Sequence, residues 1–154
     1  MRLTRRTLLP AAALVAAEAE ASTRPNEPGA VLTISLERTP CFGLCPEDRL
    51  QLRSDGTAEY TGIRGVELIG EYQGFVDPLH FRRLTRLLRR SGFFHMRERY
   101  EADATDLPSH ITTASGRRFR KSVENYGDAG PDRLWVIETA LLGIAATIRW
   151  EPVT

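Results

Sequence analysis

The sequence is poor in several features that mark whole classes of protein. Among 154 residues it has one lysine, two cysteines and two tryptophans, and aromatic side chains make up only 8%. Twenty-one basic and twenty acidic side chains leave a net charge of +1, too balanced for a protein held to nucleic acid by bulk charge. With 12 glycines and 9 prolines, both at ordinary levels, collagen-like and low-complexity chains are also excluded.

The sequence also has no hydrophobic run of membrane-spanning length. Its longest apolar run lies near the N-terminus. Residues 8–17 are apolar and follow a basic stretch that contains Arg2, Arg5 and Arg6. A membrane-spanning helix needs about 20 apolar residues, so this run is too short to cross a bilayer. Small-x-small cleavage sites follow it, and residues 1–21 are therefore expected to be a secretory signal peptide. Arg5-Arg6 is similar to the twin-arginine export motif, with an ordinary Sec signal as the alternative.

The signal peptide predicts a periplasmic or secreted protein with no transmembrane segment in the mature chain. Residues 22–30 are polar, with two prolines and a glycine, and predict a flexible leader. The remaining 31–150 are expected to form a single domain.

Hydrophobic periodicity predicts strands first and helices later. The strands are expected over 31–36, 49–53, 57–60 and 66–76, and then over 110–114 and 118–123. Asp55-Gly56 predicts the turn of the first hairpin, and the second is expected to turn around Ser115-Gly116. Helices are expected from Pro78, capped by Asp77, and from Pro131 through Ile148. Short connections favour an α+β fold, an antiparallel sheet of about five to six strands with two helices packed on one face.

The most distinctive stretch holds the only two cysteines, Cys41 and Cys45. In an oxidising compartment a disulfide is their simplest outcome. The chain must double back to join them, which Gly43 allows, while Pro40 and Pro46 stiffen entry and exit. Closing so short a loop stabilises the fold by only about 2 kcal/mol, so the bridge is expected to shape one loop.

Several segments, spread over about residues 31–150, carry a resemblance to a known family. They are Glu37-Arg38-Thr39-Pro40-Cys41-Phe42-Gly43-x-Cys45-Pro46, Asp55-Gly56-Thr57-x-x-Tyr60-x-Gly62, Phe93-Phe94, Thr105-Asp106-x-Pro108 and Lys121-x-Val123-x-x-Tyr126-Gly127. Together they resemble a bacterial family, domain of unknown function 6438. The resemblance implies an exported or lipid-anchored protein and assigns it no activity.

Metal or thiol chemistry is the alternative for the cysteines. Cys-x-x-x-Cys-Pro is also similar to the copper-binding loop of Sco-type chaperones, in which two thiolates and a distant histidine hold copper. Thiolates select Cu(I), and His80, His95 and His110 are available as a third ligand, with His95 as the candidate beside Cys41 and Cys45. In the Sco family the loop lies between a strand and a helix, whereas here a strand and a hairpin follow it. The sequence therefore favours a structural disulfide with no cofactor.

A second candidate site is the loop that carries Asp106 and His110. An acid and an imidazole on one loop are able to form an acid–base pair, with Ser109 as a nominal nucleophile. No nucleophile elbow and no glycine-rich phosphate loop accompanies them. A hydrolase is thus the weaker interpretation, and Asp106 is expected to cap its turn instead.

Arginines dominate the polar face of the first predicted helix. Arg82, Arg86 and Arg89 fall at helical spacing opposite the leucines, and residues 117–121 add a second basic cluster. Such a face is usually a solvated one, but it becomes a binding surface if the second hairpin lies beside the helix. The expected partner is then an acidic envelope component or another protein, and no nucleic acid, because the net charge of +1 is too balanced to hold one.

Together these features favour an exported, non-enzymatic binding or interaction module with a short-loop disulfide. The alternative is a periplasmic copper-binding or thiol-redox protein that uses Cys41 and Cys45.

Overall fold

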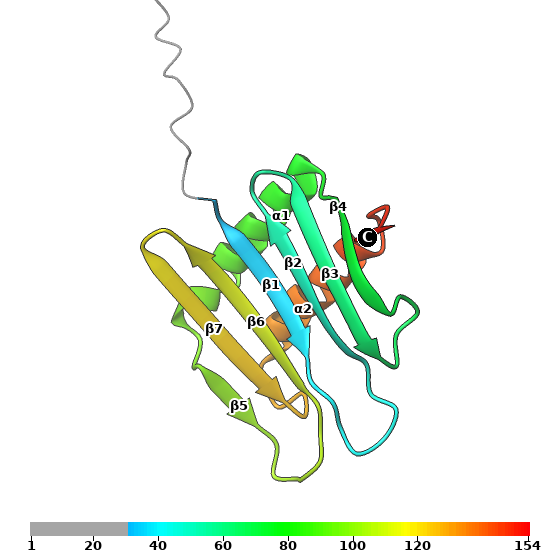
Figure 1. Ribbon diagram of the computed structural model, residues 1–154. Coiled ribbons are helices and arrows are strands. Elements are labelled where there is room, and N and C mark those ends of the chain that lie inside the picture. The colour runs from blue at the N-terminus through cyan, green and yellow to red at the C-terminus, as the bar shows by residue number, and fades with distance from the viewer. Residues whose placement is uncertain (1–30) are drawn as a thin grey trace, which may run out of the picture.

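A single eight-stranded sheet organises the computed structural model, which describes residues 31–154. The expected signal peptide and leader lie outside the described residues. The strand order is β5-β7-β6-β1-β2-β3-β4-β8, and only the β5–β7 pair is parallel. Both helices cover the same face of the sheet (Figure 1). The expected α+β class is confirmed.

The first half of the domain is a meander followed by a helix. Its elements are β1 (Thr33–Arg38), β2 (Glu47–Arg53), β3 (Thr57–Arg64), β4 (Gly70–Phe75) and α1 (Pro78–Arg90). The second half adds the other side of the sheet and the second helix. Its elements are the 3-10 helix η1 (Phe93–His95), β5 (Arg99–Glu101), β6 (Ser109–Gly116), β7 (Phe119–Tyr126), α2 (Asp132–Ala145) and β8 (Glu151–Pro152).

The expected strand count of five to six was too low. The two strands that the sequence did not predict are the edge strands, β5 with three residues and β8 with two. A period of two needs at least four residues to show, so neither strand has a detectable pattern. Both are fixed by tertiary pairing, β5 with β7 and β8 with β4.

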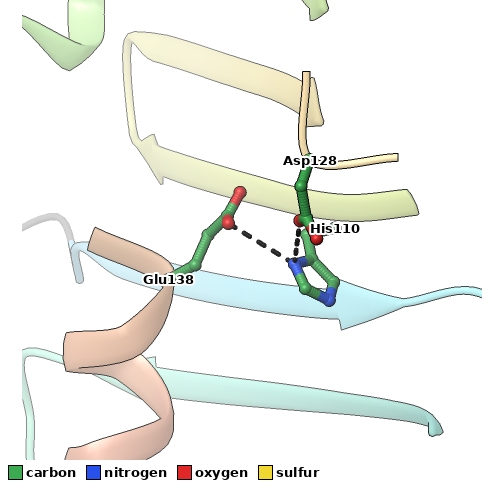
Figure 2. Close-up of side chains that lie close together, drawn as sticks. All are labelled: His110, Asp128 and Glu138. Carbon is green, nitrogen blue, oxygen red and sulfur yellow. Dashed lines mark hydrogen bonds and ion pairs between the residues drawn. The ribbon is translucent and has the colours of Figure 1, made fainter. Parts of the chain in front are cut away.

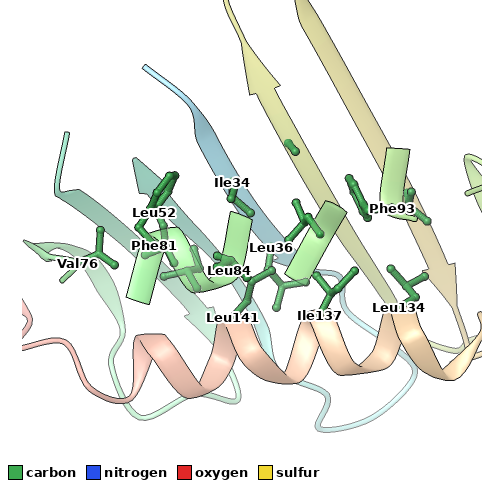
Figure 3. Packing of buried hydrophobic residues seen from close by; sticks show 14 of the residues in the cluster. Ile34, Leu36, Leu52, Val76, Phe81, Leu84, Phe93, Leu134, Ile137 and Leu141 are labelled. Atoms are coloured by element: carbon green, nitrogen blue, oxygen red, sulfur yellow. The ribbon is translucent and has the colours of Figure 1, made fainter. Parts of the chain in front are cut away.

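The core forms between the sheet and the helices because alternate strand residues face the same way. In the register of the sheet, Ile34 lies opposite Leu52 on one side and Ala114 on the other, and all three are fully buried. Side chains of α1 and α2, among them Leu84 and Ile137, pack onto this surface (Figure 3).

The start of α1 follows the expectation from the sequence. Asp77 Oδ1 accepts a hydrogen bond from the backbone N–H of Leu79 at 2.6 Å, and Pro78 occupies the first helical position.

The second helix is shorter than expected, because it ends at Ala145 and not at Ile148. Beyond it the chain folds back, and the indole N–H of Trp150 donates to the Ala145 carbonyl at 3.1 Å. Within residues 31–154, no helix is long and apolar enough to cross a membrane.

The second hairpin turns two residues later than expected. Ser115 and Gly116 continue the ladder, opposite Arg120 and Phe119, so the turn consists of residues 117 and 118. The alternation of the flanking strands did not reveal the position of the turn, because small residues such as Ser115 and Gly116 occur both in paired strands and in turns. The consequence is that two arginines form the tip of the hairpin.

Candidate functional sites

The cysteine loop joins the ends of β1 and β2. Cys41 and Cys45 form the expected disulfide, with their Cα atoms 5.6 Å apart. Gly43 has φ +150°, a conformation that residues with a side chain rarely adopt. The backbone N–H of Phe42 donates to the Asp106 carbonyl at 3.2 Å, so the loop is tied to the β5–β6 connection. The bridge therefore fixes a loop that touches the segment before His110.

A row of four polar side chains crosses the sheet at the base of this loop. The register pairs Asp48 with Arg38, Arg38 with His110, and His110 with Asn125, on β2, β1, β6 and β7. These residues have the same alternation as the core residues two positions away, so they lie on the helix-covered face. Asp48 and Asn125 are only 4% and 2% exposed. We call these four residues the polar row.

One end of the polar row is a satisfied ion pair. Arg38 Nε donates to Asp48 Oδ1 at 2.7 Å, Arg38 Nη2 donates to Asp48 Oδ2, and the Tyr60 hydroxyl donates to Asp48 Oδ2 at 2.8 Å. Burial, followed by the bond to the Asp48 carboxylate, raises the pKa of Tyr60 well above its usual value. The carboxylate is thus fully engaged, and this end is suited to holding the strands together.

The other end of the polar row meets an acidic residue of α2. His110 Nδ1 lies 3.4 Å from Glu138 Oε2 and 3.7 Å from Asp128 Oδ1, and Figure 2 shows both contacts converging on the same ring nitrogen. Glu138 is 2% exposed, and both its oxygens accept from the Asn125 amide at 3.2 Å. The backbone N–H of Gly130 donates to Asn125 Oδ1 at 2.7 Å. An imidazole and two carboxylates from three separate elements therefore face one another.

Glu138, Asp128 and Asn125 were not among the residues singled out in the sequence. A signal for Glu138 was present, because it falls in the apolar stripe of α2 with Leu134, Ile137 and Leu141. An acid inside such a stripe is costly to bury and must find a partner. Asp128 and Asn125 gave no comparable signal, since polar residues around Gly127 are typical of any turn.

The residues expected to act with the cysteines or with His110 lie elsewhere. Asp106 is exposed with φ +63°, and within residues 31–154 its carboxylate makes no hydrogen bond or ion pair. Ser109 donates through its hydroxyl to Glu124 Oε1 at 2.7 Å. His95 is exposed in η1, and the only group of three metal-ligating side chains in the described chain is His110, Asp128 and Glu138. The structure therefore brings neither His95 to the sulfurs nor Asp106 to His110.

A second candidate site, the basic groove, lies between α1 and the tip of the β6–β7 hairpin. It is a hollow of about 530 Å³, and its lining includes Leu32, Arg89, Phe94, Arg117, Arg118 and Phe119. The rings of Phe94 and Phe119 meet edge to face, with centroids 5.8 Å apart. The second hairpin thus lies beside the helix, and Arg89 joins Arg117 and Arg118 around one hollow. Arg82 and Arg86, which were predicted to belong to the same surface, do not line it.

Charge of one sign surrounds the basic groove. Segments 78–97 and 116–121 contain no aspartate or glutamate. Among the residues described, every ion pair of an arginine involves Arg38, Arg53, Arg64 or Arg99, so Arg82, Arg86 and the groove arginines have no carboxylate within 4.0 Å. An apolar hollow with unpaired guanidinium groups at its rim is suited to an anionic ligand that also carries an apolar group.

These features define a small α+β domain with an open, mostly antiparallel sheet, a short-loop disulfide and two separate candidate sites, the polar row and the basic groove. The family described as Domain of unknown function (DUF6438) matches residues 32–145, and the chain belongs to this family. No curated protein and no solved structure matches the chain.

Proposed function

We propose that the protein is an exported, non-enzymatic binding module that holds an acidic segment of an envelope protein in the basic groove. The observation that carries the proposal is the meeting of Arg89 with Arg117 and Arg118 around the Phe94–Phe119 pair. Guanidinium groups bind carboxylates through two parallel hydrogen bonds, which suits an acidic partner. The rings of Phe94 and Phe119 add exposed apolar area, which is not expected on a helix face that only contacts water.

Export is supported by the residues that precede the domain. A basic stretch, a short apolar run and small-x-small sites stand before residue 22. The disulfide between Cys41 and Cys45 agrees with an oxidising compartment such as the periplasm. These two features support the proposal that the mature protein lies in the periplasm or outside the cell.

A protein segment is favoured over a membrane surface because of the shape of the site. Phe94 and Phe119 are 37% and 46% exposed and line a hollow, so they are positioned to accept one inserted side chain. Side chains that anchor a protein on a bilayer instead protrude as a wide apolar face. The volume of the basic groove falls within the range of about 300–1,000 Å³ that ligand sites usually have.

The binding test uses fluorescence anisotropy with a labelled acidic peptide that has one central phenylalanine. We expect saturable binding that weakens with salt, and the double variant Arg89→Gln/Arg118→Gln should bind at least tenfold more weakly, since each change removes a charge-assisted hydrogen bond. Arg83→Gln is the matched control, because Arg83 is exposed on the same helix but does not line the groove.

Two results would overturn the assignment of a protein partner. One is binding that the double variant and Arg83→Gln weaken equally, which indicates bulk charge. The other is binding to phosphatidylglycerol vesicles with none to the peptide. For export, N-terminal sequencing of the protein recovered from the envelope fraction should begin close to residue 22, and a chain found only in the cytoplasm with Met1 retained contradicts it.

A further inference from the structure

We infer that His110, Asp128 and Glu138 form a binding site for a divalent transition-metal ion of the Zn²⁺ class. The three ligand atoms all lie within 4.8 Å of one another. They come from β6, from the turn between β7 and α2, and from α2 itself, so folding assembles the site. The inference is independent of the basic groove, which lies at the opposite end of β6.

The separations between His110 Nδ1 and the two carboxylates are close to those between the ligands of a zinc ion. Ligands at about 2.0–2.1 Å from a tetrahedral zinc ion are about 3.3–3.4 Å apart. His110 Nδ1 is 3.4 Å from Glu138 Oε2 and 3.7 Å from Asp128 Oδ1. Good hydrogen bonds between a ring nitrogen and a carboxylate are shorter, at about 2.7–2.9 Å. The two separations from His110 Nδ1 are therefore closer to ligand–ligand spacings than to strong hydrogen bonds, and no two of the three ligand atoms are more than 4.8 Å apart.

Glu138 is buried with little to balance its charge. A carboxylate has about four lone-pair sites, and its only hydrogen-bonding neighbours in the described chain are the Asn125 amide and the His110 ring. Arg38, next to His110 in the polar row, is engaged by Asp48 and forms no ion pair with Glu138. A divalent cation between the three groups would balance the charges of Glu138 and Asp128 together.

The surroundings have the form of an outer shell around metal ligands. Asn125 holds both oxygens of Glu138 and is itself fixed by the Gly130 N–H, and such partners orient ligating carboxylates. Asp128 is held in the left-handed region at φ +57°, directly after Gly127 at φ +62°. Its side chain is 67% exposed, so an ion can enter from solvent and keep a water ligand there.

The donor set selects the class of ion. One imidazole and two carboxylates suit Zn²⁺ and its first-row neighbours. Ca²⁺ takes six to eight oxygen ligands, which the three residues do not supply. Cu(I) prefers thiolates, and in the described chain both cysteine sulfurs are joined to each other.

The test is a zinc titration of the chain with its disulfide intact, against a chromophoric competitor and without reductant. We expect one zinc per chain, and at least tenfold weaker binding in His110→Gln and in Asp128→Asn. Asp128→Asn keeps the fold, because the residue is exposed and asparagine tolerates its left-handed backbone. His80→Gln and Asp103→Asn are the matched controls outside the group, and their affinity should stay within twofold.

A second readout reports on the ring nitrogen itself. The chain has three histidines, so their ¹⁵N signals are readily assigned, and zinc should shift Nδ1 of His110 but not the nitrogens of His80 or His95. The inference is overturned if zinc binding is not saturable, if the two ligand variants bind as tightly as the controls, or if zinc does not shift Nδ1 of His110.

Discussion

Arg38 and Asp48 lie directly opposite each other on β1 and β2, and they are joined by a two-point ion pair at the base of the cysteine loop. The side chains are 17% and 5% exposed, so the pair is largely withdrawn from water. A buried charge is tolerated only when it is paired and hydrogen-bonded, and here Tyr60 supplies the third bond. The relationship makes the pair a local clamp between the two strands that carry the disulfide loop.

Asp48→Asn should therefore be strongly destabilising. The change leaves the Arg38 guanidinium partly buried without its counter-charge, and removing one member of a buried pair costs about 3 kcal/mol or more. Urea denaturation gives the free energy of unfolding. Glu101→Gln is the control, because it breaks an ion pair with Arg99 whose side chains are 59% and 52% exposed, and it should cost less than about 1 kcal/mol. Equal losses in the two variants would contradict the clamp.

The environment of Tyr60 predicts that the free energy of unfolding falls at alkaline pH. Its pKa in the folded protein is raised by burial and by the bond to Asp48, so the neutral phenol is favoured by folding. A folded pKa above the unfolded value, about 10, contributes stability that is complete below pH 10 and is lost as the pH rises further. The free energy of unfolding of the parent should fall above pH 10, and the fall should be smaller in Tyr60→Phe. Identical pH profiles would refute the prediction.

The outline of the fold could be read from the sequence because long strands and amphipathic helices repeat their pattern over many residues. The alternation around Ile34 and Leu52 predicted two core strands, and Asp77-Pro78 marked the start of α1. The edge strands β5 and β8 and the end of α2 could not be read, because they depend on contacts with distant segments.

Only some residues of the candidate sites could be predicted from the sequence, for the same reason. His110 and the arginines were visible as chemistry, but their neighbours are set by strand register and by the packing of α2. A register one residue different would turn His110 away from Glu138. The adjacency of Arg89 to the hairpin tip likewise depends on a turn that falls at residues 117 and 118.

The disulfide should have a small effect on stability. Cys41→Ser/Cys45→Ser removes a bridge that closes a loop of only four steps, and the loop-entropy estimate of its contribution is about 2 kcal/mol. The variant should keep the circular dichroism spectrum of the parent with a lower urea midpoint. Thiol counting on the denatured, unreduced parent should find no free thiol. Two free thiols, or a variant that does not fold, would contradict a bridge that only shapes its loop.

The N-cap of α1 offers a test of the helix that carries the arginines. Asp77→Ala removes the carboxylate that accepts from the Leu79 N–H and should cost about 1 kcal/mol. Asp77→Asn keeps an acceptor at the same place and should recover most of the loss. Thermal unfolding followed by circular dichroism compares the three proteins, and an equal loss in both variants would show that the charge matters and the hydrogen bond does not.

Gly62 and Gly143 predict opposite responses to the same substitution. A Cβ atom on Gly62 would overlap the carbonyl oxygen of Leu68 in the β3–β4 connection, and backbone cannot give way as a side chain can. Gly62→Ala should therefore lower the free energy of unfolding by about 3 kcal/mol. Gly143 lies inside α2 with nothing within 4 Å of its would-be Cβ, so Gly143→Ala should raise that free energy by about 0.5–1 kcal/mol. Urea denaturation of both variants tests the two predictions, and a Gly62→Ala variant as stable as the parent would show that the Leu68 carbonyl does not lie against Gly62 in solution.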